Sequence, residues 1–130
     1  MNKILNPETV GPTNGAYSHA VEVPAGARTL HIARQVAIAP DGSVPAGFEA
    51  QAHQVWRNLV AILEAANMTV HDLVHVNHWL VDQADFETYI GVRAKYHGDA
   101  RPAATLMIVK DLVNPKFRID VRNVEWKDYI

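Results

Sequence analysis

The sequence predicts an α+β fold, in which a mixed β-sheet carries two helices packed on one face. In two segments the apolar residues recur every three or four positions, as they do in amphipathic helices. The segments around them alternate or are rich in β-branched residues, as strands are. The resulting order is β-β-β-α-β-α-β-β. Runs of strands with helices on one face are typical of this fold class.

The N-terminal part is expected to be an irregular lead-in followed by three strands. Residues 6–16 are punctuated by Pro and Gly and predict no regular structure. Strands are expected at 17–23 and 28–33, and the turn signal at 24–27 predicts that these two form a hairpin. A short third strand over 36–39 runs into a further turn signal.

Two helices are predicted from apolar stripes. The first covers 47–66, and Asn67 after it suits the left-handed conformation that ends helices. The second covers about 85–97, and Arg93 lies on its mostly apolar stripe. A cation in that place must reach solvent or find a partner.

Strands are also expected at 74–81, 104–110 and 117–126. The last of them alternates between an apolar face and a face that carries Arg118, Asp120 and Arg122. Since burying unpaired charges is costly, the charged face cannot lie under the helices. If anything covers this face, we expect it to be another subunit.

The composition and charge of the chain exclude several classes of function. The chain has 130 residues, 48% of them apolar, which suits one domain spanning residues 1–130. The formal net charge is −2, without the basic excess of a nucleic-acid binder. No cysteine is present, which excludes thiol nucleophiles and thiolate metal sites. No apolar run is long enough for a membrane helix, and the N-terminus does not resemble a secretion signal, so we expect a soluble cytoplasmic protein.

Common catalytic motifs are not found. His71, His75 and His78 have a spacing that suggests a metal site, but His75 and His78 point to opposite faces of one strand. Ordinary surface or interface histidines are the preferred interpretation. The sequence has no glycine-rich phosphate loop, and neither serine lies in a G-x-S-x-G motif.

An ordered set of short segments carries a family resemblance. The segments are Gly15-Ala16-Tyr17-Ser18-His19-Ala20-Val21, Ile32-Ala33-Arg34-Gln35, Asp41-Gly42-Ser43-Val44-Pro45, Phe48-Glu49-Ala50-Gln51, Asn58-Leu59, Leu63-Glu64-Ala65-Ala66, Val81-Asp82 to Asp85-Phe86, and Arg101-Pro102-Ala103-Ala104-Thr105. Together they resemble the RidA/YjgF family, also called L-PSP, of enamine/imine deaminases. The resemblance covers residues 10–126.

The resemblance implies a chorismate-mutase-like fold and a homotrimer with a central barrel and three clefts between subunits. It implies a small-molecule metabolite as ligand and no metal or organic cofactor. In active relatives, an arginine of a Pro-Ala-Arg-Ser segment binds the substrate carboxylate. A glutamate on the last strand positions water, and a tyrosine near the N-terminus frames the pocket.

Two catalytic candidates follow from the resemblance. The tyrosine falls on Tyr17, whose alternative role is that of a packed aromatic side chain. The acid falls on Asp120, one methylene shorter than glutamate. Its alternative role is a salt bridge with Arg118, Arg122 or a neighbouring subunit.

The arginine of the family falls on Ala104, which has no donor for a carboxylate. Losing such a contact costs about 2–5 kcal/mol of binding free energy. Arg34, next to Gln35 at the expected cleft, could supply a guanidinium instead, or it could pair with an acid at the trimer interface. Arg101 and Arg93 are further candidates. The predicted substrate-binding residues are therefore Arg34, Ala104, Arg101 and Gln35.

Three functions remain open. The first is hydrolysis of a small imine or enamine to a carbonyl compound and ammonia, which needs little machinery. The second is a trimer that binds a metabolite or a partner without turnover, and the alanine at position 104 favours it. The third is the ribonuclease or translation inhibitor of an older family name, and the net charge counts against it.

Overall fold

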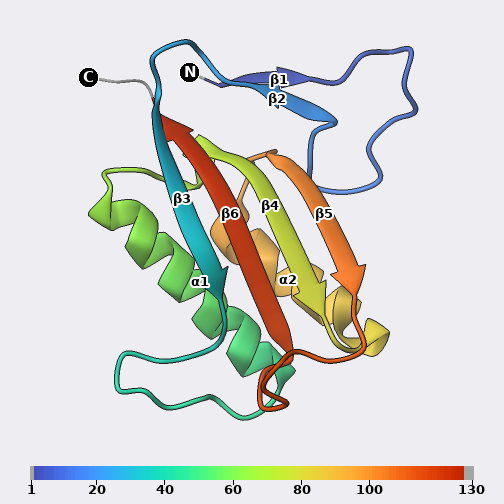
Figure 1. Cartoon of the computed structure of the whole chain (residues 1–130). Coiled ribbons are helices and arrows are strands. Elements are labelled where there is room, and N and C mark those ends of the chain that lie inside the picture. The colour runs from blue at the N-terminus through green and yellow to red at the C-terminus, as the bar shows by residue number, and fades with distance from the viewer. Residues whose placement is uncertain (1, 128–130) are drawn as a thin grey trace.

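The computed structural model describes residues 2–127 and contains the predicted classes of element (Figure 1). The strands and helices, with two short 3₁₀ turns, are β1 (Lys3–Leu5), β2 (Ala20–Glu22), β3 (Arg28–Gln35), α1 (Phe48–Ala65), η1 (Val70–Asp72), β4 (Leu73–Leu80), η2 (Gln83–Asp85), α2 (Phe86–His97), β5 (Ala103–Ile108) and β6 (Ile119–Lys127).

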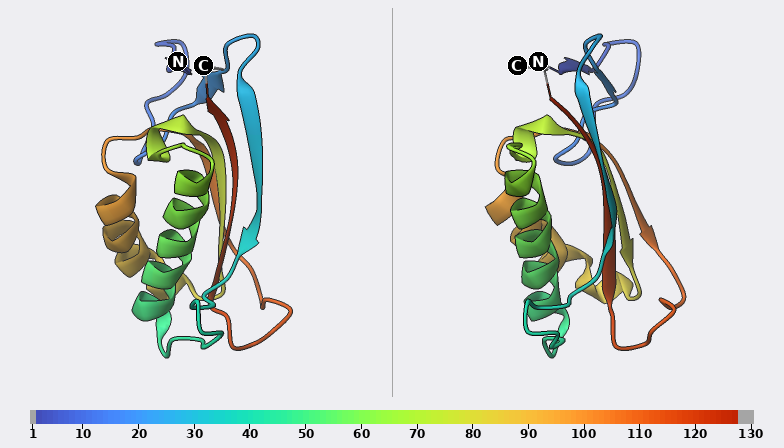
Figure 2. Two further views of the ribbon diagram at one scale, coloured as in Figure 1. Left: turned by 90° about the vertical axis from the view of Figure 1, so that its left-hand side faces the viewer. Right: turned by 60° about the vertical axis from the view of Figure 1, so that its left-hand side comes forward.

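A four-stranded mixed sheet has the order β3-β6-β4-β5. β4 and β5 are parallel, and β6 pairs antiparallel with both β3 and β4. Both helices lie on the same face of this sheet, and no helix of the described chain covers the other face (Figure 2). The predicted α+β fold with a mixed sheet and two helices on one face is confirmed.

The core lies between the helices and the sheet. The predicted stripe of α1 is buried there, with Val55, Trp56 and Leu59 fully enclosed. From the sheet side, alternate residues of β4 and β6 face them. Asn67 follows α1 with φ of 57°, the left-handed conformation expected of it.

The predicted hairpin of 17–23 with 28–33 is wrong. β2 pairs with β1 in a separate two-stranded sheet, and β3 pairs with β6. β3 joins the larger sheet because Leu30 and Ile32 pack on the core there. Residues 17–19 form no strand beyond a single bridge between Ser18 and Ala103 of β5.

The predicted strand over 36–39 is also wrong. The chain leaves the sheet after Gln35, and its backbone finds partners that are not strands. The Asn58 side-chain amide on α1 donates to the carbonyls of Ile38 and Val36, at 3.0 and 3.4 Å. Ala39 N–H donates to the carbonyl of Ser43 within the following turn. Local polar partners therefore replace a strand neighbour.

The uncovered face of the sheet carries the charged side of β6, as predicted. Asp120 pairs in register with Trp79 of β4 on this face, while Ile119 and Val121 point into the core. Within residues 2–127, no helix is long and apolar enough to cross a membrane.

Candidate functional site

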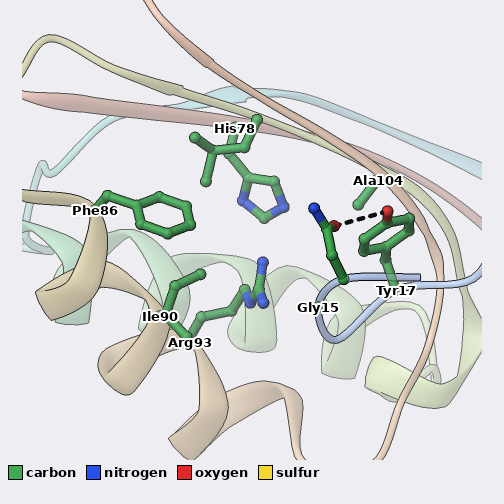
Figure 3. A pocket seen from close by; sticks show the side chains of 9 residues that line it. Gly15, Tyr17, His78, Phe86, Ile90, Arg93 and Ala104 are labelled. Atoms are coloured by element: carbon green, nitrogen blue, oxygen red, sulfur yellow. Dashed lines mark hydrogen bonds between the residues drawn. The ribbon is translucent and has the colours of Figure 1, made fainter. Parts of the chain in front are cut away.

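A pocket of about 260 Å³ opens between α2 and the β5 edge of the sheet, and we call it the edge pocket. Three parts of the chain form its walls: the N-terminal loop, the helix-facing side of β4 and β5, and α2. The residues are Asn14, Gly15, Tyr17, His78, Ala104, Leu106, Phe86, Ile90 and Arg93. Figure 3 shows these side chains converging on one space.

The N-terminal loop is fixed against β5 next to this pocket. Ser18 forms a parallel bridge with Ala103, and its backbone N–H donates to the carbonyl of Pro102 at 3.0 Å. The Tyr17 hydroxyl donates to Asn14 Oδ1 at 3.0 Å. These contacts hold the Tyr17 ring at the pocket wall nearest Ala104 (Figure 3).

His78 lies on the inward face of β4 at the back of the pocket and is 1% exposed. Its Nδ1 hydrogen-bonds the hydroxyl of Tyr89, and that hydroxyl also accepts the indole N–H of Trp56 at 3.1 Å. The one proton of the Tyr89 hydroxyl has His78 Nδ1 as its acceptor among the described groups, so we assign that proton to the bond with Nδ1. The neutral imidazole therefore carries its proton on Nε2.

Burial lowers the pKa of His78 well below its usual value, and the charges of Arg93 and His97 lower it further. The imidazole is therefore neutral at physiological pH, so His78 can donate one hydrogen bond without carrying a charge.

Arg93 points from α2 into the pocket, toward the space between His78 and the loop that carries Gly15 (Figure 3). Its side chain is 7% exposed, and no carboxylate of the described side chains pairs with it. Burial lowers the pKa of Arg93, although a guanidinium stays protonated at neutral pH. The edge pocket thus contains a buried positive charge.

A second candidate site, which we call the acid site, lies on the uncovered face of the sheet. Arg34 Nε is 3.1 Å from Asp120 Oδ2, and the Arg34 guanidinium lies 5.9 Å from the ring centroid of Trp79. The loop over 109–113 borders the same cavity. Asp120 is 3% exposed, whereas more than half of the Arg34 side chain is exposed.

The two carboxylate oxygens of Asp120 have different surroundings. Oδ2 contacts Arg34, and Oδ1 is buried without a partner among the described residues. Burial raises the pKa of the Asp120 carboxyl, and the charge of Arg34 opposes that rise. Oδ1 thus has an unmet hydrogen-bonding capacity, with almost no solvent-exposed surface of its own in this state of the chain.

Of the three alternative partners named for Asp120, which are Arg118, Arg122 and a neighbouring subunit, Arg118 is engaged elsewhere. Arg118 pairs instead with Asp85 at 2.9 Å, near the start of α2. Arg34 has an acidic partner, and within the single chain that partner is Asp120.

Two other predicted binding residues lie in neither site. Gln35 ends β3, and its side-chain amide donates to the carbonyl of Ala33 at 3.2 Å. Arg101 folds back on the helix end, where it donates to the carbonyls of Gly98 and Ala100. Its charge nevertheless lowers the pKa of Arg93, so it adds positive potential beside the edge pocket.

The structure therefore divides the predicted residues between two places. Tyr17 and Ala104 line the edge pocket, and Arg34 and Asp120 form the acid site. Asp120 and its neighbour Val121 alternate across β6, so the acid lies on the opposite face of the sheet from the helices. One chain alone does not bring Tyr17 and Asp120 to the same ligand.

Sequence reasoning missed His78 and Asn14 as pocket residues. The signal for His78 was present, because a histidine on the apolar face of a buried strand needs a polar partner. That partner, Tyr89, lies 11 residues away on α2. Asn14 carried no usable signal, since it lies in the irregular lead-in and acts through its contact with Tyr17.

Comparisons with known proteins agree on one family. The family profile described as Endoribonuclease L-PSP matches residues 9–124. A RutC family protein of Pyrococcus horikoshii is 32% identical, covering 98% of this chain and all of that protein. The 2-iminobutanoate/2-iminopropanoate deaminase of Mus musculus is 31% identical, covering 79% of this chain and 76% of that protein.

Solved structures share the fold over nearly the whole chain. YyfB of Yersinia pestis, a Rid family protein of unknown function, superimposes with a TM-score of 0.85 at 32% identity, covering 97% of this chain and 98% of that one. RidA of the Antarctic bacterium Psychrobacter gives a TM-score of 0.72 at 28% identity, covering 96% and 99%.

Proposed function

Since the chain belongs to the RidA/YjgF family, whose profile is described as Endoribonuclease L-PSP, we propose that it hydrolyses a small imine or enamine to a carbonyl compound and ammonia. The observation that carries the proposal is Asp120. Its carboxylate is buried, one oxygen contacts Arg34, and the other has no hydrogen-bond partner among the described residues. The naming of the mouse relative as an iminobutanoate/iminopropanoate deaminase supports the reaction class.

The chemistry needs one water molecule and one acid–base group. The imine reacts in its protonated form, C=NH2⁺. The Asp120 carboxylate accepts a proton of the water while the water oxygen bonds to the imine carbon and the C=N electron pair moves to nitrogen, which gives a neutral carbinolamine. The same carboxyl returns the proton to nitrogen and ammonia leaves as the C–N bond breaks. The hydroxyl proton passes through the carboxylate to the ammonia as the C=O bond forms, so the products are the carbonyl compound and ammonium. An enamine first takes a proton on carbon to become the imine. Proton transfer by one positioned group contributes about 10²–10⁴-fold.

The proposed site is a cleft between subunits of a homotrimer. The edge pocket and the acid site lie on opposite faces of one sheet. In the proposed trimer, the edge pocket of one protomer meets the acid site of the next, so that Tyr17 and Asp120 flank the same ligand. The open sheet faces, which no helix of the described chain covers, would then line the central barrel.

The test is ammonia release from 2-iminobutanoate that a partner enzyme generates in buffer without amine traps. We expect Asp120→Asn to lower the turnover rate by about 10²–10⁴-fold. Asp120→Glu should keep measurable activity, because it keeps the carboxyl group. Asp41→Asn, the same change at an exposed turn, is the matched control and should leave the rate unchanged. Size-exclusion chromatography with light scattering should give the mass of a trimer.

A second candidate is a trimer that binds a metabolite without turnover. The observation that favours it is the methyl group of Ala104 in the edge pocket, at the position where the resemblance expects an arginine. Turnover that is the same in wild type and Asp120→Asn, or absent in both, would contradict the deaminase proposal. Ligand-dependent thermal stabilisation without turnover would favour the binding protein.

A further inference from the structure

We infer that Arg93 on α2 is the carboxylate-binding group of the edge pocket, and that the ligand it takes is a small monocarboxylic acid with a short apolar side chain. The inference adds to the proposed function. It rests on that function only in the choice of acid, because the acid resembles the proposed imine substrate. The resemblance assigned no role to this helix position. What points to Arg93 is its charge without a carboxylate partner, inside a pocket that no acidic residue of the described chain lines.

The first step is the charge itself. The Arg93 side chain is 7% exposed, and among the described side chains no carboxylate lies within ion-pair distance of it. A buried cation without a counter-ion is costly, and proteins normally pair such a group or place it where it binds a ligand.

The polar groups around Arg93 in the edge pocket also favour an anionic ligand. None of the residues that line the described pocket is acidic. His78 presents its Nε2 proton, since its Nδ1 accepts from the hydroxyl of Tyr89. Asn14 Oδ1 is already used by the Tyr17 hydroxyl, which leaves the Asn14 amide N–H groups as donors. A guanidinium with further donors and no competing anion fits a carboxylate.

The edge pocket also has room for such a ligand. Ala104 contributes only a methyl group to the pocket, so the volume next to β5 is open to the Arg93 guanidinium from the opposite wall. Phe86, Ile90 and Leu106 supply the apolar remainder. The cavity of about 260 Å³ holds an acid of a few carbon atoms with room to spare. A planar fork from α2 can thus replace one from β5.

The test measures binding, not turnover, with 2-oxobutanoate as the probe and its neutral amide as the comparison. By calorimetry, wild type should bind the acid more tightly than the amide. Arg93→Met should weaken binding of the acid by about 30-fold or more and remove the preference over the amide. Arg57→Met, at an exposed position of α1, is the matched control and should keep both.

A double variant adds a gain of binding. Arg93→Met/Ala104→Arg should bind 2-oxobutanoate more tightly than Arg93→Met alone, because the guanidinium re-enters the pocket from β5. If Arg93→Met does not fold, the ¹⁵Nε signal of Arg93 in wild type serves instead, and it should shift when 2-oxobutanoate is added. An unchanged signal would overturn the inference, and so would equal affinity of wild type and Arg93→Met.

The outcomes separate this inference from the proposed function. If wild type binds the acid through Arg93 but releases no ammonia from an imine, only the deaminase proposal fails. If wild type turns over an imine at a rate that Arg93→Met leaves unchanged, only the role of Arg93 fails.

Discussion

Two arginines near the candidate sites have opposite surroundings. Arg34 is more than half exposed and pairs with the buried carboxylate of Asp120. Arg93 is almost fully buried and has no carboxylate partner among the described side chains. The more exposed of the two charges is thus paired within the protein, and the more buried one has no carboxylate partner among the described side chains.

This difference indicates how the two charges are used. In the acid site, Arg34 sets the position and the protonation of a carboxyl group, so its charge is already satisfied in the free protein. In the edge pocket, the charge of Arg93 is satisfied only when an anion enters. From this difference between the two arginines, we infer that Arg34 adjusts the pKa of Asp120 and that Arg93 selects the ligand.

The largest expected effect comes from the hydrogen bonds that join Trp56, Tyr89 and His78 behind the edge pocket. Tyr89→Phe removes the hydroxyl that joins Trp56 to His78, and it leaves two buried polar groups without partners. At about 1–3 kcal/mol for each such group, we expect a loss of about 2–4 kcal/mol of unfolding free energy. Urea denaturation measures it. A loss below the value for a single hydrogen bond would show that the network does not stabilise the pocket.

The next prediction compares the two arginines by the sign of a stability change. Arg93→Met removes an unpaired buried charge and should raise the free energy of unfolding of the ligand-free protein by about 1–3 kcal/mol. Arg34→Met leaves Asp120 buried without its partner and should lower it, by about 1 kcal/mol, since Arg34 is largely exposed. Thermal and urea unfolding of both variants measure these changes, and the same sign in both would contradict the comparison.

A third prediction concerns the pH dependence of the acid site. Burial raises the pKa of Asp120, and the nearby Arg34 charge holds it down. Arg34→Gln removes that charge, which disfavours the ionised carboxylate, so the pKa should rise further. If the ionised form is the active base, the acidic limb of the pH–rate profile should move to higher pH. The reverse shift, or none, would show that Arg34 does not tune Asp120.

Asp120 also affects stability, with a definite sign. Because its pKa in the folded protein lies above the ordinary value near 3.8, the folded state holds this proton more tightly than the unfolded state does. Stability from this group is therefore greatest at acidic pH and falls as the pH rises through the raised pKa. Asp120→Asn should flatten that part of the stability curve.

The smallest expected effect is at Tyr17. Tyr17→Phe removes one hydrogen bond to Asn14 but keeps the ring at the pocket wall. We expect a loss of about 0.5–1.5 kcal/mol in binding of 2-oxobutanoate, measured by calorimetry. A much larger loss would indicate that the hydroxyl itself contacts the ligand.

Much of the fold was predictable because its patterns are local. The stripe of α1, the alternation along β4 and β6, and the left-handed Asn67 can each be recognised within about twenty residues. Strand pairing was not predictable in the same way. The partner of β3 is β6, about ninety residues away, and only the packing of Leu30 and Ile32 on a distant core selects it.

The candidate site was predictable in part. The resemblance named Tyr17, Ala104, Arg34 and Asp120, and the structure places them in two cavities. Arg93 was visible as a cation on an apolar stripe, but its lack of a carboxylate partner is a tertiary property. Whether a charge is paired depends on side chains from α2, β4 and the N-terminal loop together, which no single segment reveals.

The bridge between Ser18 and Ala103 has a consequence beyond ligand binding. β5 is the last strand of its sheet, with Met107 and Ile108 exposed on it, and a bare strand of this kind invites another chain to add to it. By hydrogen-bonding Pro102 at the beginning of β5, the backbone of Ser18 blocks one end of that strand. Shortening or loosening the first sixteen residues would therefore favour self-association and aggregation as well as altering the pocket.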